Sequence, residues 1–329
     1  MRLRRLAVFA GLCLVIAVTG CNPLAGSPGG ASGQTVTVAV VPGIDNATLY
    51  LAKQQGLFTN AGINVQIRDY SSVSAELAAL SNGSVDIAAG DYGDLFYAEA
   101  NAPSPIYTIV ADGYDAAPGV IEIMTMPNSP ITSPADLAGK TVLAPSTGVV
   151  AHGPSNFPDS LAIASATSVL NSYGVNMSVV TWRHRSQSAE INALVHHRAA
   201  AVLLTQPYVY QAQQDGAVEL ADACSGATAG IPLSGYFSVR AWSSAANDKA
   251  AIAAFQSAIA QAAAQAAMPG PIQKLLPNYA GVSAQEAALV STGVYPLSTN
   301  AANIQRTADL MNQQSMIRQR INVAAMLVH

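Results

Sequence analysis

Polar side chains with hydrogen-bonding or acid–base capacity recur where apolar, strand-like segments of this sequence end. Asp45 and Asn46, for example, follow the apolar residues 35–41 and a Pro-Gly pair. Loops that follow parallel strands meet at one edge of a sheet, so side chains in such loops can surround a small molecule together. The chemistry expected of them is recognition by hydrogen bonds and charge. The candidates for ligand contact are Asp45, Asn46, Asp91, Tyr92, Ser146, Thr147, Gln187, Thr205 and Gln206.

Several of these residues also have a purely structural interpretation. Asp45 or Asn46 can cap the helix expected after them, and Asp91 can cap a helix as readily as contact a ligand. Tyr92 can offer a flat apolar wall with a hydroxyl at its edge. The hydroxyls and backbone N–H groups at residues 146–147 suit an anion.

The ligand class stays open on the sequence. Arg183 and Arg185 follow the predicted strand 178–182, where a guanidinium can pair with a carboxylate, sulfonate or phosphate, or remain solvated. Anions such as sulfonates, nitrate or carboxylates fit these arginines. A flat heteroaromatic such as a pyrimidine fits instead a set of aromatic side chains, which are Tyr50, Tyr92, Trp182, Tyr208 and Tyr236.

Catalytic and metal-binding patterns are missing from the sequence. It contains no HExxH, CxxC, GxSxG or GxxxxGK[ST] motif. His196 and His197 are adjacent and face different sides of a helix, so they do not form a two-histidine face. We therefore expect no catalytic residue, no metal and no cofactor.

The first 34 residues have the features of an export signal followed by a tether. Residues 1–5 are basic, and residues 6–18 form an apolar run too short to span a bilayer as a helix. Small residues precede Cys21, which resembles the lipobox of bacterial lipoproteins. Residues 1–20 are thus interpreted as a lipoprotein signal peptide, Cys21 as the lipidation site and residues 21–34 as a lipid-anchored flexible tether. Ordinary cleavage, with Cys21 incidental, is the alternative.

The composition narrows the partners and the redox chemistry. Removal of residues 1–20 takes three arginines away and moves the formal net charge from −4 to about −7. No basic run remains, which argues against nucleic acid as a partner. Cys224 would then be the only thiol besides Cys21, so an internal disulfide is not expected, and a small buried apolar role is predicted for it.

Alternating strand-like and helix-like segments must position the candidate residues. Apolar segments at 35–41, 63–70, 85–89 and 107–111 are separated by helical patterns, and a second such series runs from 141 to 205. No repeat of 20–50 residues is apparent. We predict an α/β fold of two lobes joined by two crossover segments. Lobe 1 comprises residues 35–125 and 234–329, and lobe 2 comprises residues 126–233.

Short stretches in a fixed order resemble a known family. They are LYLAKQQGLF at 49–58, GINV at 62–65, ALSNGSVDIA at 79–88, DLAGKTV at 136–142, NAL at 192–194 and TQPY at 205–208. Together they resemble the nitrate/sulfonate/taurine-type substrate-binding proteins of ABC transporters, a group that includes thiamine-pyrimidine-precursor-like proteins. The stretch HHRAA at 196–200 departs from the family's usual Gly followed by Asp-Ala, at a helix–strand joint away from the expected cleft.

The resemblance implies a type II periplasmic-binding-protein fold with a ligand cleft between two hinged lobes. The combined prediction is a monomeric lipoprotein on the extracytoplasmic face of the cell membrane. It would capture a small organic or anionic solute and deliver it to ABC permease and ATPase subunits. The alternatives are a ligand-sensing lipoprotein without transport and a thiamine-precursor-synthase-like enzyme. That enzyme depends on a cysteine-rich motif which this chain lacks.

Overall fold

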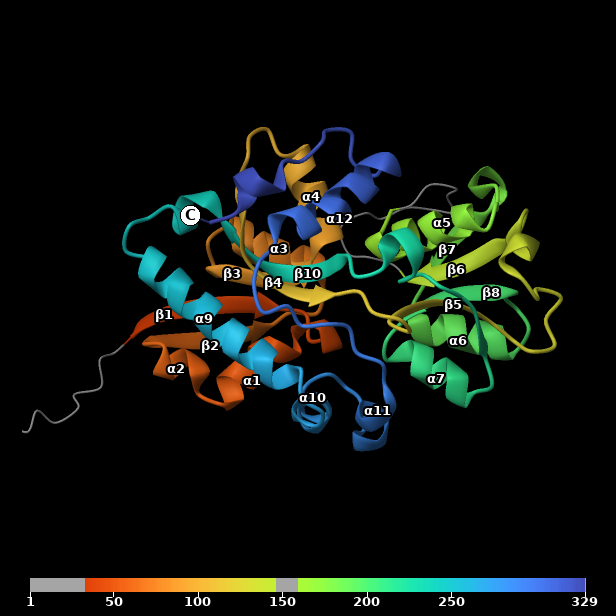
Figure 1. Cartoon of the computed structure of the whole chain (residues 1–329), viewed down its shortest axis with the longest axis horizontal. Coiled ribbons are helices and arrows are strands. Elements are labelled where there is room, and N and C mark those ends of the chain that lie inside the picture. The colour runs from red at the N-terminus through yellow and green to blue at the C-terminus, as the bar shows by residue number, and fades with distance from the viewer. Residues whose placement is uncertain (1–32, 146–158, 329) are drawn as a thin grey trace, which may run out of the picture. The chain divides into compact units, whose positions relative to one another are not determined.

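The computed structural model describes residues 33–145 and 159–328. The chain divides into the units Met1–Ala31 and Ser32–His329, and all described residues belong to the second unit. Two five-stranded sheets with helices on both faces make up this unit (Figure 1). The predicted signal peptide, Cys21, Ser146 and Thr147 lie outside the described residues. Among the described helices, none combines the length and the apolar character that a membrane crossing requires.

The first sheet has the strand order β2-β1-β3-β10-β4, in which β10 runs antiparallel to both of its neighbours. Side chains alternate along β1, where Val36, Val38 and Val40 face one layer of helices and Ala39 faces the other. Both faces are covered, which explains why this strand is apolar throughout. The strands are β1 (Gln34–Val40), β2 (Ile63–Asp69), β3 (Ile87–Asp91), β4 (Tyr107–Asp115) and β10 (Pro232–Val239).

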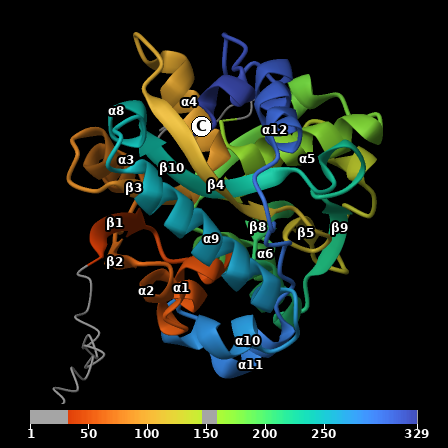
Figure 2. The ribbon, with the colours of Figure 1, turned by 60° about the vertical axis from the view of Figure 1, so that its left-hand side comes forward.

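Helices cover both faces of the first sheet (Figure 2). One layer is formed by α1 (Ala47–Gln54), α2 (Leu57–Asn60) and α9 (Lys249–Ala266). The other layer is formed by α3 (Val73–Ser81), α4 (Tyr92–Asn101) and α12 (Ala301–Gln313). Side-chain caps set three of the helix starts: Ser72 accepts from Ala75, Asp91 from Gly93 and Asn300 from Ala302. The remaining helices of this lobe are α8 (Arg240–Ser243), α10 (Pro271–Leu275) and α11 (Ala284–Leu289).

The second sheet repeats the arrangement of the first, with the order β7-β6-β8-β5-β9 and β5 antiparallel to its neighbours. Helix α5 (Leu161–Ser172) covers one face, while α6 (Gln187–Val195) and α7 (Tyr208–Gln214) cover the other. The strands are β5 (Ile121–Thr125), β6 (Thr141–Pro145), β7 (Thr181–Arg185), β8 (Ala201–Thr205) and β9 (Val218–Asp222). The predicted α/β fold of two lobes is confirmed.

A short sequence motif accompanies this correspondence between the lobes. Helix α3 connects β2 to β3, and α6 connects the equivalent strands β7 and β8. The sequence SVSAELAAL at 72–80 covers the first helix start, and SQSAEINAL at 186–194 covers the second. In both copies the glutamate is buried: Glu76 is 1% exposed and Glu190 is 0% exposed. The two copies match over nine residues only, so no longer repeat is apparent.

The chain crosses between the sheets twice, and the first crossing differs from the prediction. Residues 116–120 link β4 to β5, and residues 223–231 link β9 to β10. The prediction places residues 35–125 in the first lobe. Strand β5 pairs with β8 and β9, however, so residues 121–125 belong to the second lobe. The prolines after Thr125 therefore follow the first strand of the second lobe. The expected return at residue 234 falls inside β10.

The strand predicted at 178–182 lies three residues further along the chain. The side chain of Asn176 accepts a hydrogen bond from the Ser178 N–H and begins a short 3₁₀ turn over Met177–Val179. The strand β7 then starts at Thr181, which places Arg183 and Arg185 within the strand instead of in the loop after it.

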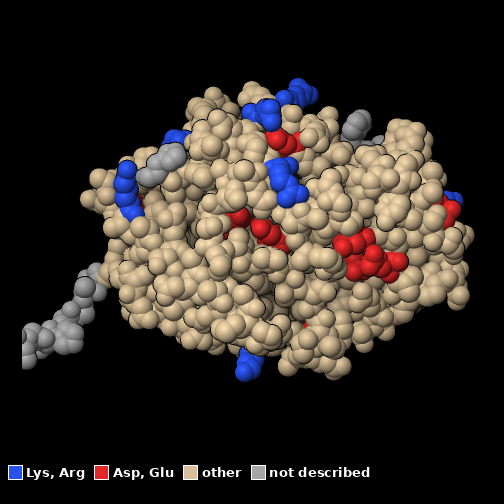
Figure 3. Space-filling view, viewed as in Figure 1, with Lys and Arg blue, Asp and Glu red and all other residues tan. Residues whose placement is uncertain are grey.

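Ion pairing contributes little to this fold. Charged side chains are sparse on the face shown in Figure 3. The pair between Arg320 and Asp309 is 3.2 Å long, and the arginine side chain is 74% exposed, so solvent weakens it. The stability of the two lobes rests on the apolar layers between sheets and helices.

Candidate functional site

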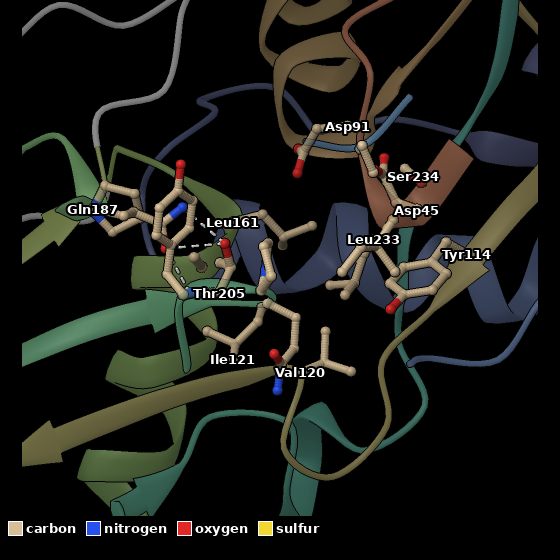
Figure 4. Close-up of a pocket in the computed structure, with 18 of the residues that line it drawn as sticks. Asp45, Asp91, Tyr114, Val120, Ile121, Leu161, Gln187, Thr205, Leu233 and Ser234 are labelled. Carbon is tan, nitrogen blue, oxygen red and sulfur yellow. Dashed lines mark hydrogen bonds between the residues drawn. The ribbon is translucent and has the colours of Figure 1, made fainter. Parts of the chain in front are cut away.

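A cavity of about 520 Å³ lies between the two sheets (Figure 4). Residues at the carboxyl ends of β1, β3, β4, β6 and β8 line it, together with the starts of β5 and β10, which run in the opposite direction. The first residues of α3, α6 and α7 contribute as well. Its volume is within the range of small-molecule sites.

Carboxylates lie on the first-lobe side of the cavity. Asp45 follows β1, Asp91 ends β3, and Asp94 lies on the first turn of α4. Ser234 and Tyr114 complete this side, and Figure 4 shows Asp91, Asp45, Ser234 and Tyr114 grouped there. The Tyr114 hydroxyl accepts a hydrogen bond of 2.5 Å from the Gly293 N–H.

Amides and a hydroxyl lie on the second-lobe side. Gln187 begins α6, and its carbonyl oxygen accepts from the backbone N–H of Thr205 at 2.7 Å while its Nε2 donates to Thr205 Oγ1 at 3.0 Å. These two bonds lock the helix start to the end of β8 (Figure 4). Gln206 Nε2 donates to the Gly119 carbonyl at 2.9 Å, which ties the end of β8 to the first crossing segment. The Oε1 of Gln206 is buried and has no hydrogen-bond partner among the described residues.

Apolar side chains separate the two polar sides. Val120 from the first crossing, Ile121 from β5, Leu161 from α5 and Leu233 from β10 line this middle part. An apolar wall between polar ends suits an amphiphilic organic molecule better than a bare inorganic ion.

A hydrogen bond joins the two lobes at the rim of the cavity. Gln211 of α7 lines the cavity, and its Nε2 donates to Glu286 Oε1 of α11 at 2.9 Å. The crossing segments are joined as well, since the Ala116 N–H donates to the Ile231 carbonyl at 2.8 Å. Both lobes thus contact each other beside the cavity and at the crossings.

The structure brings five of the predicted site residues together around the cavity: Asp45, Asp91, Gln187, Thr205 and Gln206. Two others, Asn46 and Tyr92, do not line the cavity. Asn46 is buried and its Nδ2 donates to the Val41 carbonyl at 3.1 Å, which stabilises the turn after β1. Tyr92 is fully buried in the first lobe, where its ring packs between Phe96 and Phe237 and its hydroxyl donates to Asp112 at 3.0 Å.

The arginines and most of the aromatic residues considered for the ligand lie elsewhere. Arg183 and Arg185 are exposed on β7 and do not line the cavity. Trp182 is buried in the second lobe, Tyr236 pairs with Thr48 at 2.9 Å, and Tyr50 stacks on Tyr279. Of these aromatic residues Tyr208 alone lines the cavity.

Sequence reasoning missed Asp94, Tyr114 and Ser234. Asp94 lies three residues after Asp91, a spacing that places both on one side of a helix start. Tyr114 was missed because β4 extends to Asp115, four residues beyond the predicted end of that strand at 111. Ser234 follows from the antiparallel direction of β10, which turns its first residues toward the cavity.

Burial opposes ionisation of the cavity carboxylates. It raises the pKa of Asp45 to about 6 and that of Asp94 to about 6. Burial together with the charge of Asp94 raises the pKa of Asp91 well above its ordinary value. Each carboxylate therefore ionises less readily than it would in water.

The described residues contain no group of three or more His, Cys, Asp and Glu side chains arranged to hold a metal ion. His184 instead pairs with Asp159 at 2.6 Å, and its Nδ1 is 3.1 Å from the Pro145 carbonyl. Cys224 is buried, lies away from the cavity, and burial raises the pKa of its thiol to about 12. A thiol with so high a pKa is a poor nucleophile near neutral pH.

Comparison with solved structures shows the fold. The aliphatic sulphonate binding protein SsuA from Escherichia coli superposes with a TM-score of 0.70 at 18% identity, over 90% of this chain and 98% of that one. The alkanesulfonate-binding protein SsuA from Xanthomonas axonopodis pv. citri, bound to MOPS, has a TM-score of 0.68 at 19% identity, over 90% and 99% of the two chains. The desulfurization enzyme DSZB has a TM-score of 0.61 at 14% identity, over 89% and 96%.

These structures confirm the predicted periplasmic-binding-protein fold, and they include both binding proteins and an enzyme. No curated protein sequence matches the chain. The model of the NMT1/THI5-like family matches residues 44–271, which include both crossings and most of the residues around the cavity. The chain therefore belongs to the NMT1/THI5-like family.

Proposed function

We propose that this protein is the extracytoplasmic solute-binding lipoprotein of an ABC importer. It captures a small molecule between its lobes and delivers it to the permease and ATPase subunits. The observation that carries the proposal is the cavity of about 520 Å³, lined by carboxylates of one lobe and amides of the other. The SsuA proteins, which share the fold, are binding proteins for sulfonates, and this supports solute binding as the role.

The two-sided lining supports a mechanism of lobe closure. A ligand that touches both lobes is bound better when the lobes are close, and it shifts the hinge equilibrium by that difference in affinity. The crossing segments 116–120 and 223–231 are the only covalent links between the lobes within the described residues, so they are the expected hinge. A permease can then distinguish loaded from empty protein by its shape.

Passive binding fits the site better than catalysis does. The cavity lining includes no cysteine, histidine or lysine among the described residues, so it offers no thiol, imidazole or amine for nucleophilic or base catalysis. Cys224, the cysteine that an enzymatic interpretation would use as the nucleophile, is buried and resists ionisation. The fold shared with DSZB does not transfer an activity, because fold does not fix function.

The test combines ligand screening with a measurement of shape. The full chain, purified in mild detergent, is screened by thermal shift against amines, sulfonates, pyrimidines, nitrate and amino acids. A ligand at ~100 times its dissociation constant adds ~2.7 kcal/mol of stability. The hit is then followed by calorimetry and small-angle scattering. We expect tight binding with compaction and recovery of the unaltered ligand.

Matched variants separate cavity residues from their surroundings. Asp45→Ala and Gln187→Ala, one from each lobe, should each weaken binding by ~5–150-fold, since each removes a polar contact worth ~1–3 kcal/mol. Asp69→Ala and Gln214→Ala remove exposed residues of the same types in the same lobes and should leave affinity unchanged. Binding without compaction, or recovery of a chemically altered ligand, would contradict the proposal.

A further inference from the structure

The cavity carries acidic side chains without basic ones. Asp45, Asp91 and Asp94 line it, and its described lining includes neither Lys nor Arg. A ligand in this cavity therefore meets three carboxyl groups and no cationic side chain from the described lining.

A fourth carboxylate stands behind the first three. Glu76 is 1% exposed, and neither of its oxygens has a hydrogen-bond partner among the described residues. It lies one turn after Val73, which lines the cavity, so both share one face of α3. Its carboxylate lies against Gly90, where a Cβ would be 3.3 Å from Oε1, and Gly90 directly precedes Asp91. Glu76 thus points toward the acidic end of the cavity, and no cationic side chain forms an ion pair with it among the described residues.

A buried carboxylate without an ion-pair partner is costly in free energy, because burial removes the water that solvated it and the protein supplies no counter-charge instead. Burial and the nearby charge of Asp45 raise the pKa of Glu76 well above its ordinary value. An incoming cation supplies the missing counter-charge, whereas an incoming anion adds to the repulsion. Charge complementarity therefore separates the two ligand classes.

We propose that the cavity takes an organic cation, namely a protonated amine or amidine with an apolar body. Its charged head meets Asp45, Asp91 and Asp94, and its body lies against Ile121, Leu161 and Leu233. N–H groups on the head suit the free acceptors of the site. A metal ion fits less well, since the described residues hold no cluster of three metal-ligating side chains and the middle of the cavity is apolar. The inference rests on the proposed solute-binding function.

On this proposal, the chain does not share the sulfonate binding of the structurally similar SsuA proteins. The arginines expected to hold an anion, Arg183 and Arg185, lie on the exposed part of β7 outside the cavity. The described lining of the cavity thus presents carboxyl groups, and no guanidinium group, to a ligand.

The test uses compounds that share one apolar body and differ only in the head group. We titrate the full chain in detergent at pH 7.5 with benzylamine, benzyl alcohol and phenylmethanesulfonate, and follow binding by calorimetry and thermal shift. The same measurements are made with butylamine, butanol and butanesulfonate. We expect the amines to bind at least 10-fold more tightly than the alcohols and sulfonates. Asp45→Asn and Asp91→Asn should each weaken amine binding by about 10- to 100-fold, since each removes a charge-assisted contact.

Two controls keep the outcome decisive. Asp69→Asn removes an exposed carboxylate at the end of the neighbouring strand β2 and should change affinity less than twofold. Asp91 also caps α4, so thermal melting checks that its variant folds, and Asp94→Asn repeats the test without loss of that cap. Sulfonates that bind as tightly as amines would overturn the cation inference and leave solute binding intact. Failure of every compound to bind would count against both.

Discussion

The carboxyl groups at the cavity are the residues on which the proposed choice of a cationic ligand depends. Two unit charges at about 4 Å interact by about 4 kcal/mol at an effective dielectric constant of 20. This exceeds the ~1 kcal/mol net contribution of a typical hydrogen bond. A sulfonate placed beside the ionised Asp45 would therefore need several new hydrogen bonds to offset the repulsion. An ammonium group in the same place gains that energy instead.

Asp45→Asn should stabilise the ligand-free protein at neutral pH and not in acid. The ordinary carboxyl pKa is 3.8, and burial raises that of Asp45 to about 6, with Ser234 opposing the shift and the buried Glu76 nearby. The folded state thus keeps a proton that the unfolded state loses, and stability falls as pH rises from about 4 through 6. The free energy of unfolding of the variant should be higher by about 1–3 kcal/mol at pH 7.5, because asparagine carries no charge to bury. The gain is limited because part of the Asp45 side chain reaches the cavity and is solvated there.

Urea unfolding of both proteins at pH 4 and pH 7.5 measures this difference. Asp69→Asn, an exposed carboxylate of the same sheet, provides the comparison. A gain of equal size at both pH values would show that Asp45 acts through packing and not through its charge.

At the scale of elements, helices α3 and α6 begin with the same motif but face different surroundings. Glu76 has Asp45 and Asp94 nearby, whereas burial alone raises the pKa of Glu190 to about 9. Glu190 is therefore a neutral acid near pH 7, buried against the second sheet, and both its oxygens lack partners among the described residues. It contributes volume to the core but no satisfied hydrogen bond.

Glu190→Met should raise the free energy of unfolding by about 1–3 kcal/mol, since an apolar side chain of similar length removes the unsatisfied polar group. Glu190→Gln keeps the polar group and should change stability much less. Guanidinium unfolding midpoints at pH 7 compare the three proteins. Loss of stability in the methionine variant would mean that the carboxyl group has a partner essential to the fold.

The strands and the paired lobes could be predicted from sequence because β1, β6 and β8 are short apolar runs that end at turn residues. The first crossing could not, since residues 121–125 are fully buried and would fit either sheet; only their pairing with β8 and β9 decides. Tyr92 illustrates the same limit. It follows a strand end as a ligand residue would, but the direction of α4 turns its ring into the core.

At the scale of the whole molecule, the C-terminal third completes the first lobe. Strand β10 joins the sheet that contains β1, and helices α9 and α12 pack on the faces of that sheet. Helix α12 also contacts the second crossing, where Arg306 donates to the Ala229 carbonyl at 2.8 Å. The second crossing, which is one of the two expected hinge segments, is thus held against α12. On the proposed mechanism, closure moves the second lobe against a first lobe that is built from both ends of the described chain.

Anchoring belongs to the same scale and is a prediction from the sequence. Cys21→Ser should prevent lipidation, so that no form processed at residue 20 is found in the membrane fraction. Fractionation of cells expressing the two forms, with mass spectrometry of the N-terminus, measures both effects. Membrane association of the serine variant at the processed size would refute the lipid anchor.

The burial of Cys224 makes the protein a convenient subject for spectroscopy. Its side chain is 2% exposed and resists ionisation, so maleimide and nitroxide reagents should leave it unmodified in a folded protein that begins after Cys21 and therefore also lacks Cys13. Cysteines introduced at exposed positions of the two lobes, such as Lys249 and Gln214, would then be the reactive pair. A dye or spin label at each site would report the distance between the lobes, and hence the fraction of closed molecules, with only the two labelled residues of the lobes replaced.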